Sequence, residues 1–132
     1  MKSDIAYALE KLKDAVERLK EGVAAAGSGL EKDGVIQRFE FSFELMWKAG
    51  KLILEDKGII AANPKDVLKG MFRQGWLKNE NGALDMLEDR NKMAHVYSRK
   101  AAEVIYVRIK ESHADYIEQA YKSLNSAVKE DK

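Results

Sequence analysis

The sequence contains no cysteine and only one proline in its 132 residues. The lack of cysteine excludes disulfide bonds, thiolate metal sites and cysteine nucleophiles. One proline and nine glycines leave few interruptions, which favours long helices over many short strands. No apolar run approaches the roughly 20 residues that span a bilayer, and no basic leader precedes an apolar segment. We therefore expect a cytoplasmic protein with no membrane partner.

An excess of charge of one sign is also missing, since 23 basic residues balance 22 acidic ones for a net charge of +1. A net charge of this size does not indicate a nucleic-acid binder. The balance shifts locally, because every charged side chain between residues 90 and 100 is basic. Hydrophobic residues make up 45% of the chain, which is enough for one compact core. We expect a single domain over 1–132, with a frayed tail from about residue 129.

The spacing of apolar residues predicts two long helices in the first half of the chain. Apolar side chains over 5–23 alternate at intervals of four and three, and Ser3 or Asp4 is expected to cap this helix. A second helix is expected over 32–57, ending before Gly58. This second helix is apolar on nearly all sides, which is typical of a central helix or of one that also faces a subunit interface.

The second helix also predicts a homodimer. Phe41, Leu45 and Leu52 lie off its main apolar stripe. A second subunit or the last helix of the bundle is expected to cover them, since apolar side chains in such number are seldom left in water.

Three further helices complete the expected fold. A short one runs over Pro64–Gln74 with Asn63 as its cap and Phe72 turned inward. A longer helix follows over about 83–95, and the last one starts after Ser98 and ends near Val128. The sum is an all-α, up-and-down bundle of four long helices and one short helix.

The residues best able to carry chemistry lie at the junction of the last two long helices. Arg90, Asn91, His95 and Tyr97 fall within eight positions. A purely structural interpretation is available, because basic side chains near a helix C-terminus bind its free carbonyls. A functional one is that histidine moves protons while the arginine fork binds phosphate. The pair would suffice for metal-independent RNA cleavage if a symmetric dimer supplied a second histidine.

Other polar residues are expected to have structural roles. Glu40 and Glu44 are one turn apart, but no histidine or aspartate joins them at a spacing that suits a metal. They are expected to be solvated or paired with Lys48 and Lys51. His113 is expected to be half exposed and far from the Arg90 motif.

The order Arg90-Asn91-x-x-x-His95-x-Tyr97 resembles the Arg-x4-His-x-Tyr motif of HEPN domains. Three longer segments, over 35–48, 64–69 and 86–91, are similar to the branch of that group known as nucleotidyltransferase substrate-binding proteins. The resemblance covers about residues 3–125. It implies a helical-bundle homodimer that is encoded beside a separate small nucleotidyltransferase.

The resemblance also implies roles for individual residues. Arg90 and His95 would be the catalytic pair of an endoribonuclease, and Asn91 would orient the site. Tyr97 would accept AMP from the partner enzyme, which silences the ribonuclease. No metal and no cofactor is implied. The basic side chains expected to bind RNA phosphate are Lys92, Arg99 and Lys100.

Three functions therefore stay open at the level of sequence. The first is a toxin of a toxin–antitoxin pair that cleaves RNA and is controlled by AMPylation. The second is a non-catalytic substrate-binding subunit of a two-chain nucleotidyltransferase. The third is a structural helical module whose motif only caps a helix. The chain has no Gly-Ser and acidic-triad pattern of a nucleotidyltransferase catalytic domain, so we do not expect it to transfer nucleotides itself.

Overall fold

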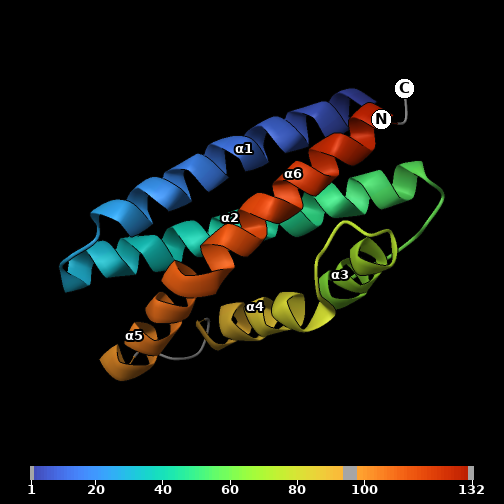
Figure 1. The fold of residues 1–132 in the computed structure, drawn as a ribbon. Helices are drawn as coiled ribbons and strands as arrows, with labels where there is room; N and C mark the ends of the chain where they lie inside the picture. Colours follow the sequence, from blue (N-terminus) through green and yellow to red (C-terminus); the bar gives the residue numbers. More distant parts are fainter. Residues whose placement is uncertain (1, 94–97, 131–132) are drawn as a thin grey trace.

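The structure is a computed structural model that describes residues 2–93 and 98–130, and within these ranges it contains helices and no strand. The expected all-α bundle is confirmed, with α3 as the short helix and α5, η1 and α6 joined into one long helical segment (Figure 1). The elements are α1 (Lys2–Ala25), α2 (Gly29–Asp56), α3 (Pro64–Arg73), α4 (Glu80–Met93), α5 (Arg99–Arg108), the π-helical turn η1 (Ile109–His113) and α6 (Ala114–Glu130).

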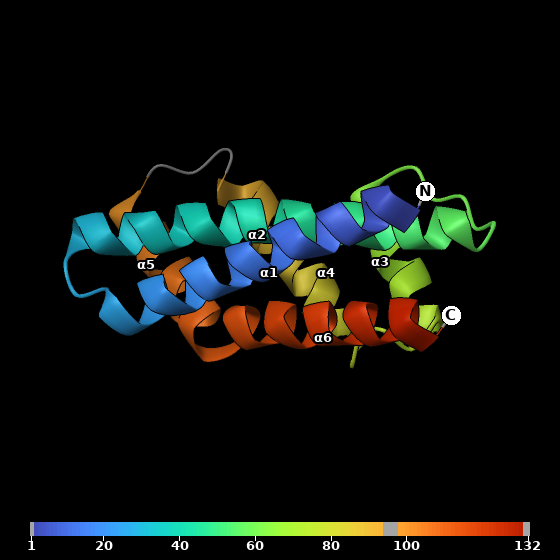
Figure 2. The ribbon, with the colours of Figure 1, turned by 90° about the horizontal axis from the view of Figure 1, so that it is seen from above.

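Three long helices, α1, α2 and α6, lie side by side and form the main body of the bundle (Figure 2). The α1 helix packs against both α2 and α6, and α3 packs between α2 and α4. The start of α1 and the end of α6 lie at the same end of the molecule, and α5 lies at the opposite end (Figure 1). There α5 packs against α2. None of the described helices is long and apolar enough to cross a membrane.

The α1 helix buries the predicted apolar seam. Five of its six seam residues are buried and the sixth, Val23, is partly buried against the core. The predicted cap is wrong, because the helix already begins at Lys2 and so contains Ser3 and Asp4 within its first turn. The buried seam residues are Ile5, Leu9, Leu12, Val16 and Leu19.

The α2 helix begins three residues earlier than predicted, at Gly29. Ser28 is its N-cap, and the Ser28 hydroxyl accepts a hydrogen bond from the Glu31 backbone N–H at 3.1 Å. The Glu31 carboxylate accepts one in return from the Ser28 N–H at 2.9 Å. This capping box satisfies backbone donors that a later start would leave open. The helix ends before Gly58, as predicted, and this glycine has a positive φ of 83°.

The side of α2 that predicted a homodimer is covered within this chain. Leu45 and Leu52 are partly buried against the core. The Arg18 guanidinium of α1 lies 4.9 Å from the centre of the Phe41 ring. These three residues are each partly buried within one chain, and the homodimer stays a prediction.

The short helix α3 forms as predicted behind Asn63, whose side chain accepts a hydrogen bond from the Asp66 N–H at 2.9 Å. One detail is wrong, because Phe72 does not turn inward and is 38% exposed. The loop after α3 instead buries Trp76 and Leu77.

The remaining helices differ from expectation mainly at their ends. The α4 helix begins at Glu80 rather than Ala83, and its predicted end at His95 lies outside the described residues. Ser98 caps α5 as predicted, with its hydroxyl accepting from the Ala101 N–H at 3.1 Å. The α6 helix continues to Glu130, so the first two residues of the expected frayed tail are helical.

Candidate functional site

Arg90 is oriented by a carboxylate on a neighbouring helix. The Arg90 guanidinium on α4 forms an ion pair with Glu44 on α2, and it donates to the Asn91 side-chain oxygen at 3.1 Å. The Arg90 side chain is partly exposed. The two predicted site residues on α4 therefore lie together, and Arg90 reaches α2.

The carboxylates of α2 differ from expectation. Glu44 lies 3.9 Å from the predicted partner Lys48, but it also pairs with Arg90 and accepts a hydrogen bond from the Trp47 indole N–H at 3.2 Å. Lys51 pairs with Glu55 instead. Burial raises the pKa of Glu40 above its ordinary value, and the charge of Arg90 opposes this shift. Glu44 therefore pairs with the Arg90 guanidinium, and the charge of that guanidinium also favours the ionised form of Glu40.

Asp89 lies on the other side of α4 and is almost fully buried, at 1% exposure. Its carboxylate accepts a hydrogen bond from His113 Nε2 at 2.7 Å and one from Arg108 Nη1, also at 2.7 Å. The His113 ring stacks on Phe39 of α2, with ring centres 5.3 Å apart. The prediction for His113 is wrong, because this histidine is buried and contacts the residue next to Arg90.

The π-helical turn η1 explains how one carboxylate reaches two side chains five residues apart. Arg108 and His113 would lie roughly 140° apart around a regular α-helix. In a π turn the backbone bonds run from i to i+5, so residues at this spacing come closer to one side. Because η1 ends at His113, both side chains can meet Asp89.

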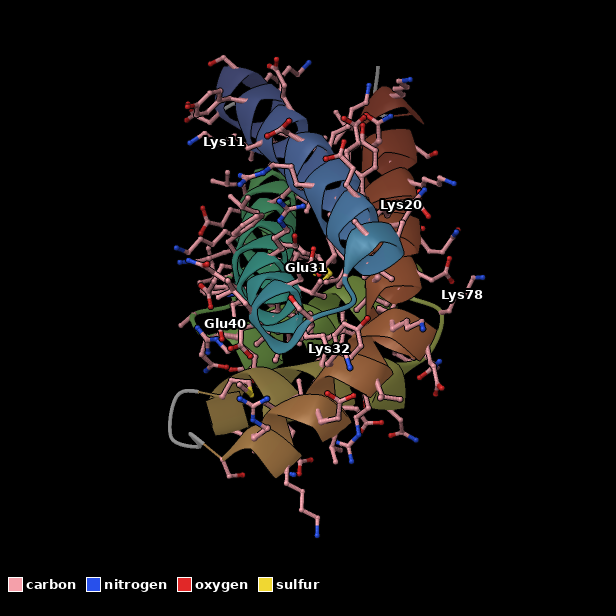
Figure 3. All side chains as sticks on the ribbon, turned by 90° about the vertical axis from the view of Figure 1, so that its left-hand side faces the viewer. Lys11, Lys20, Glu31, Lys32, Glu40 and Lys78 are labelled. Carbon is pink, nitrogen blue, oxygen red and sulfur yellow. The ribbon has the colours of Figure 1, made fainter. Side chains whose placement is uncertain are left out.

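A cleft of about 1400 Å³ opens between α2 and α5 and is called the α2–α5 cleft below. Three of its apolar side chains are exposed: Leu30 at 83%, Val104 at 46% and Val107 at 38%. In Figure 3, Lys32 lies on the flank of α2 toward α5, while Glu40 lies on the opposite flank. The charged side chains that line the cleft are Lys32, Asp33, Arg99, Lys100, Glu103 and Arg108.

The charge in the α2–α5 cleft is positive. Four basic side chains line it against two acidic ones. One of each is paired, because Lys32 lies 3.0 Å from Glu103 and also sits over the Tyr106 ring at 5.1 Å. Arg108 pairs with Asp89, which lies outside the cleft lining. An anionic ligand with an apolar part would suit this surface.

The structure separates the predicted site residues into two groups. Arg99 and Lys100 line the α2–α5 cleft. Arg90 and Asn91 are not among the residues that line it, and Arg90 pairs with Glu44 instead. Lys92 also lies off the cleft, and it pairs with Glu88 at 3.2 Å on the exposed side of α4.

His95 and Tyr97 lie outside the described residues. Within the described ranges, no group of three or more histidine or acidic side chains is arranged to hold a metal ion. Neither Asp89 nor Arg108 is among the site residues predicted from the sequence. No periodic pattern in the sequence indicates them, because they are joined by a contact between α4 and the end of α5, 19 residues apart in the chain.

Known proteins resemble this chain over nearly its whole length. The family model described as "Nucleotidyltransferase substrate binding protein like" matches residues 3–126. A crystal structure of a protein from Thermus thermophilus is 34% identical, with a TM-score of 0.78, over 86% of this chain and 98% of that one. No curated protein matches this chain.

A second structure is similar in fold. A Haemophilus influenzae protein, described as showing the fold of a substrate-binding domain of a nucleotidyltransferase, has a TM-score of 0.67 and 22% identity. The match covers 95% of this chain and 99% of that one, and at this identity it supports the fold alone. Because the family model covers residues 3–126, the chain belongs to the family of nucleotidyltransferase substrate-binding-like proteins.

Proposed function

We propose that this chain is the substrate-binding subunit of a nucleotidyltransferase whose catalytic domain is a separate protein chain. Membership of the family supports a substrate-binding role. The observation that carries the proposal is the α2–α5 cleft, which combines exposed apolar side chains with a net positive lining. In this arrangement the chain holds the substrate and the partner supplies the catalytic residues for nucleotidyl transfer.

The size of the cleft and its place in the fold fit this division of labour. Small-molecule pockets usually enclose about 300–1000 Å³, whereas this cleft is larger and has exposed residues on its walls. A substrate held in an exposed cleft can still be reached by a second protein. The α5 helix, which lines the cleft, lies at the end of the bundle opposite the start of α1 and the end of α6 (Figure 1).

The test is transfer of labelled AMP from ATP by a nucleotidyltransferase encoded beside this chain. We expect a substrate fraction to be labelled only when both proteins are present. Val104→Glu should abolish the labelling, because it places an acid on the cleft wall. Ile60→Glu is the matched control, since Ile60 is exposed and lies outside the cleft lining. Equal labelling with and without this chain would contradict the proposal.

A second candidate, RNA cleavage, has one observation in its favour. Arg90 is partly exposed and held by Glu44 and Asn91, so its guanidinium has a fixed position from which to bind a phosphate. We propose His95 as the matching acid and base and Tyr97 as the acceptor of AMP, on the resemblance to HEPN domains. Lys92 would add a phosphate contact beside Arg90.

An RNA-cleavage assay beside the labelling experiment separates the two candidates. AMP on Tyr97 of this chain, detected by mass spectrometry, would identify Tyr97 as the acceptor, which a binding subunit that presents Tyr97 to the partner also allows. RNA cleavage by the purified chain, lost in His95→Ala, would establish that candidate. Absence of cleavage together with labelling of a separate substrate would eliminate it.

A further inference from the structure

We propose that Arg108 binds a phosphate group of the substrate in the α2–α5 cleft and that Asp89 holds it in position for this. The inference rests on the proposed substrate-binding function and names the chemical class that the cleft selects. Arg108 carries it because its side chain is half exposed, lines the cleft, and is tied to a buried carboxylate.

The Asp89 end of the Arg108–Asp89 ion pair is buried and is held by a second partner. The Asp89 side chain is 2% exposed and also accepts the hydrogen bond from His113, itself 6% exposed. His113 in turn stacks on Phe39 in the core. A carboxylate fixed from two sides cannot follow a moving arginine, so Asp89 defines where the Arg108 guanidinium lies.

The exposed end of Arg108 is available to a ligand. The hydrogen bond to Asp89 uses Nη1, at 2.7 Å from Oδ1, and a guanidinium has five N–H donors in a planar fork. The side chain is 50% exposed, so other donors of the fork are accessible from the cleft. A fork that is already oriented loses less entropy when it binds two oxygens of one phosphate.

The surroundings of Arg108 add positive charge. Arg99 and Lys100 line the same cleft at the start of α5, and both are exposed. The acidic residues of the lining are Asp33 and Glu103, of which Glu103 is paired with Lys32. Exposed Val104 and Val107 lie between the two ends of α5, so an apolar moiety can rest between two phosphate-binding points.

A phosphate could be carried by a free nucleotide or by a polynucleotide strand. Both present the same oxygens to Arg108. The experiment therefore measures the binding of a short fluorescein-labelled oligonucleotide and of ATP as its competitor, with the full chain at low salt. Displacement by ATP would identify the nucleotide as sufficient, and binding of the oligonucleotide without displacement would identify the strand.

The decisive variant is Arg108→Lys, which keeps the charge and can still pair with Asp89 but removes the planar fork. We expect about a tenfold loss of affinity for the bound probe. Arg73→Lys is the matched control, because Arg73 is exposed on α3 and lies outside the cleft lining; it should bind as the wild type does. The urea midpoint of each variant reports whether the fold is kept.

A measurement on the wild-type chain keeps the test independent of any folding defect. The Arg108 Nε–Hε signal in a 15N NMR spectrum should shift when ATP or the oligonucleotide is added. Equal binding by Arg108→Lys, an unmoved Arg108 signal, or no binding of either probe would overturn the inference. Full Arg108-dependent binding without any partner-dependent transfer would overturn the proposed function and leave the phosphate site standing.

Discussion

At the scale of single residues, Asp89 joins three parts of the bundle through one buried carboxylate. It belongs to α4 and accepts hydrogen bonds from Arg108 at the end of α5 and from His113 at the end of η1. Buried ion pairs contribute little net stability when intact, but removing one partner leaves an uncompensated polar group in the core. The contribution of Asp89 to stability is therefore best measured by removing its charge, which leaves its buried partner uncompensated.

We expect Asp89→Asn to destabilise the fold by about 3 kcal/mol, because it leaves Arg108 and the buried His113 without their anionic partner. Urea denaturation measures this change. Asp85→Asn is the control on the same helix, where the exposed carboxylate should be replaceable at a cost below about 0.5 kcal/mol. Equal stabilities of the two variants would show that the charge of Asp89 contributes nothing measurable to the free energy of unfolding.

At the scale of elements, two of the three glycines of α2, Gly34 and Gly50, have opposite surroundings. A Cβ at Gly50 would lie within 3.0 Å of the Sδ, Cε and Cγ atoms of Met71, and Met71 is fully buried on α3. A Cβ at Gly34 would meet nothing within 4 Å. Gly50 thus permits the close contact of α2 with α3, whereas Gly34 only weakens the helix.

We expect Gly50→Ala to destabilise the fold by about 1–2 kcal/mol, since the overpacking against Met71 outweighs the gain in helix propensity. Gly34→Ala should stabilise it by about 0.5–1 kcal/mol, because the propensity gain is then unopposed. Thermal unfolding of the two variants gives the opposite signs directly. A stabilising Gly50→Ala would mean that Met71 can repack freely.

The capping box at the start of α2 predicts a pH dependence. The Ser28 and Gly27 backbone N–H groups and the Ser28 side chain, in that order, hold the pKa of Glu31 below its ordinary value of 4.5. A lowered folded-state pKa means that the contribution of Glu31 is present above the unfolded pKa and is lost as pH falls through the folded one. The wild-type chain should therefore lose this stability progressively below pH 4.5.

Glu31→Gln tests the origin of that loss. The amide oxygen can still accept the two backbone hydrogen bonds, but its charge no longer changes with pH. We expect the stability difference between wild type and variant to shrink as pH falls from neutral to below the pKa of Glu31, measured by urea midpoints at each pH. A constant difference across this range would assign the effect to geometry rather than charge.

At the scale of the whole molecule, the residues that predicted a homodimer are partly buried within one chain. The Arg18 guanidinium lies over the Phe41 ring, and Leu45 and Leu52 pack against the core. A second surface that a dimer could use is the α2–α5 cleft, which has exposed apolar residues. Such a dimer would compete with a substrate for the cleft.

We expect the homodimer to form without occupying the cleft. Sedimentation velocity at micromolar concentration should give the same dimeric mass for the wild type and for Val104→Glu. A monomeric Val104→Glu beside a dimeric wild type would place the interface in the cleft. A monomeric wild type would remove the second His95 that the RNA-cleavage candidate requires.

The sequence by itself determined the helices and most of their limits, because these depend on local chemistry. The apolar seam of α1, the Asn63 cap and the glycine that follows α2 each act within a few residues. The start of α2, which was predicted three residues too late, also depends on local chemistry, because Ser28 and Glu31 form a capping box whose spacing is visible in the sequence. The motif around Arg90 and its family were also recognisable from residue order alone.

Only the tertiary structure decided which of the polar residues act together. Sequence order grouped Arg90 with Arg99 and Lys100, but the bundle turns Arg90 toward Glu44 on α2 and leaves the other two in the cleft with Arg108. His113 joined the site only because a π turn carries it to Asp89. These contacts join residues far apart in the chain, and their geometry depends on how helices cross and where one of them is interrupted, which no local pattern encodes.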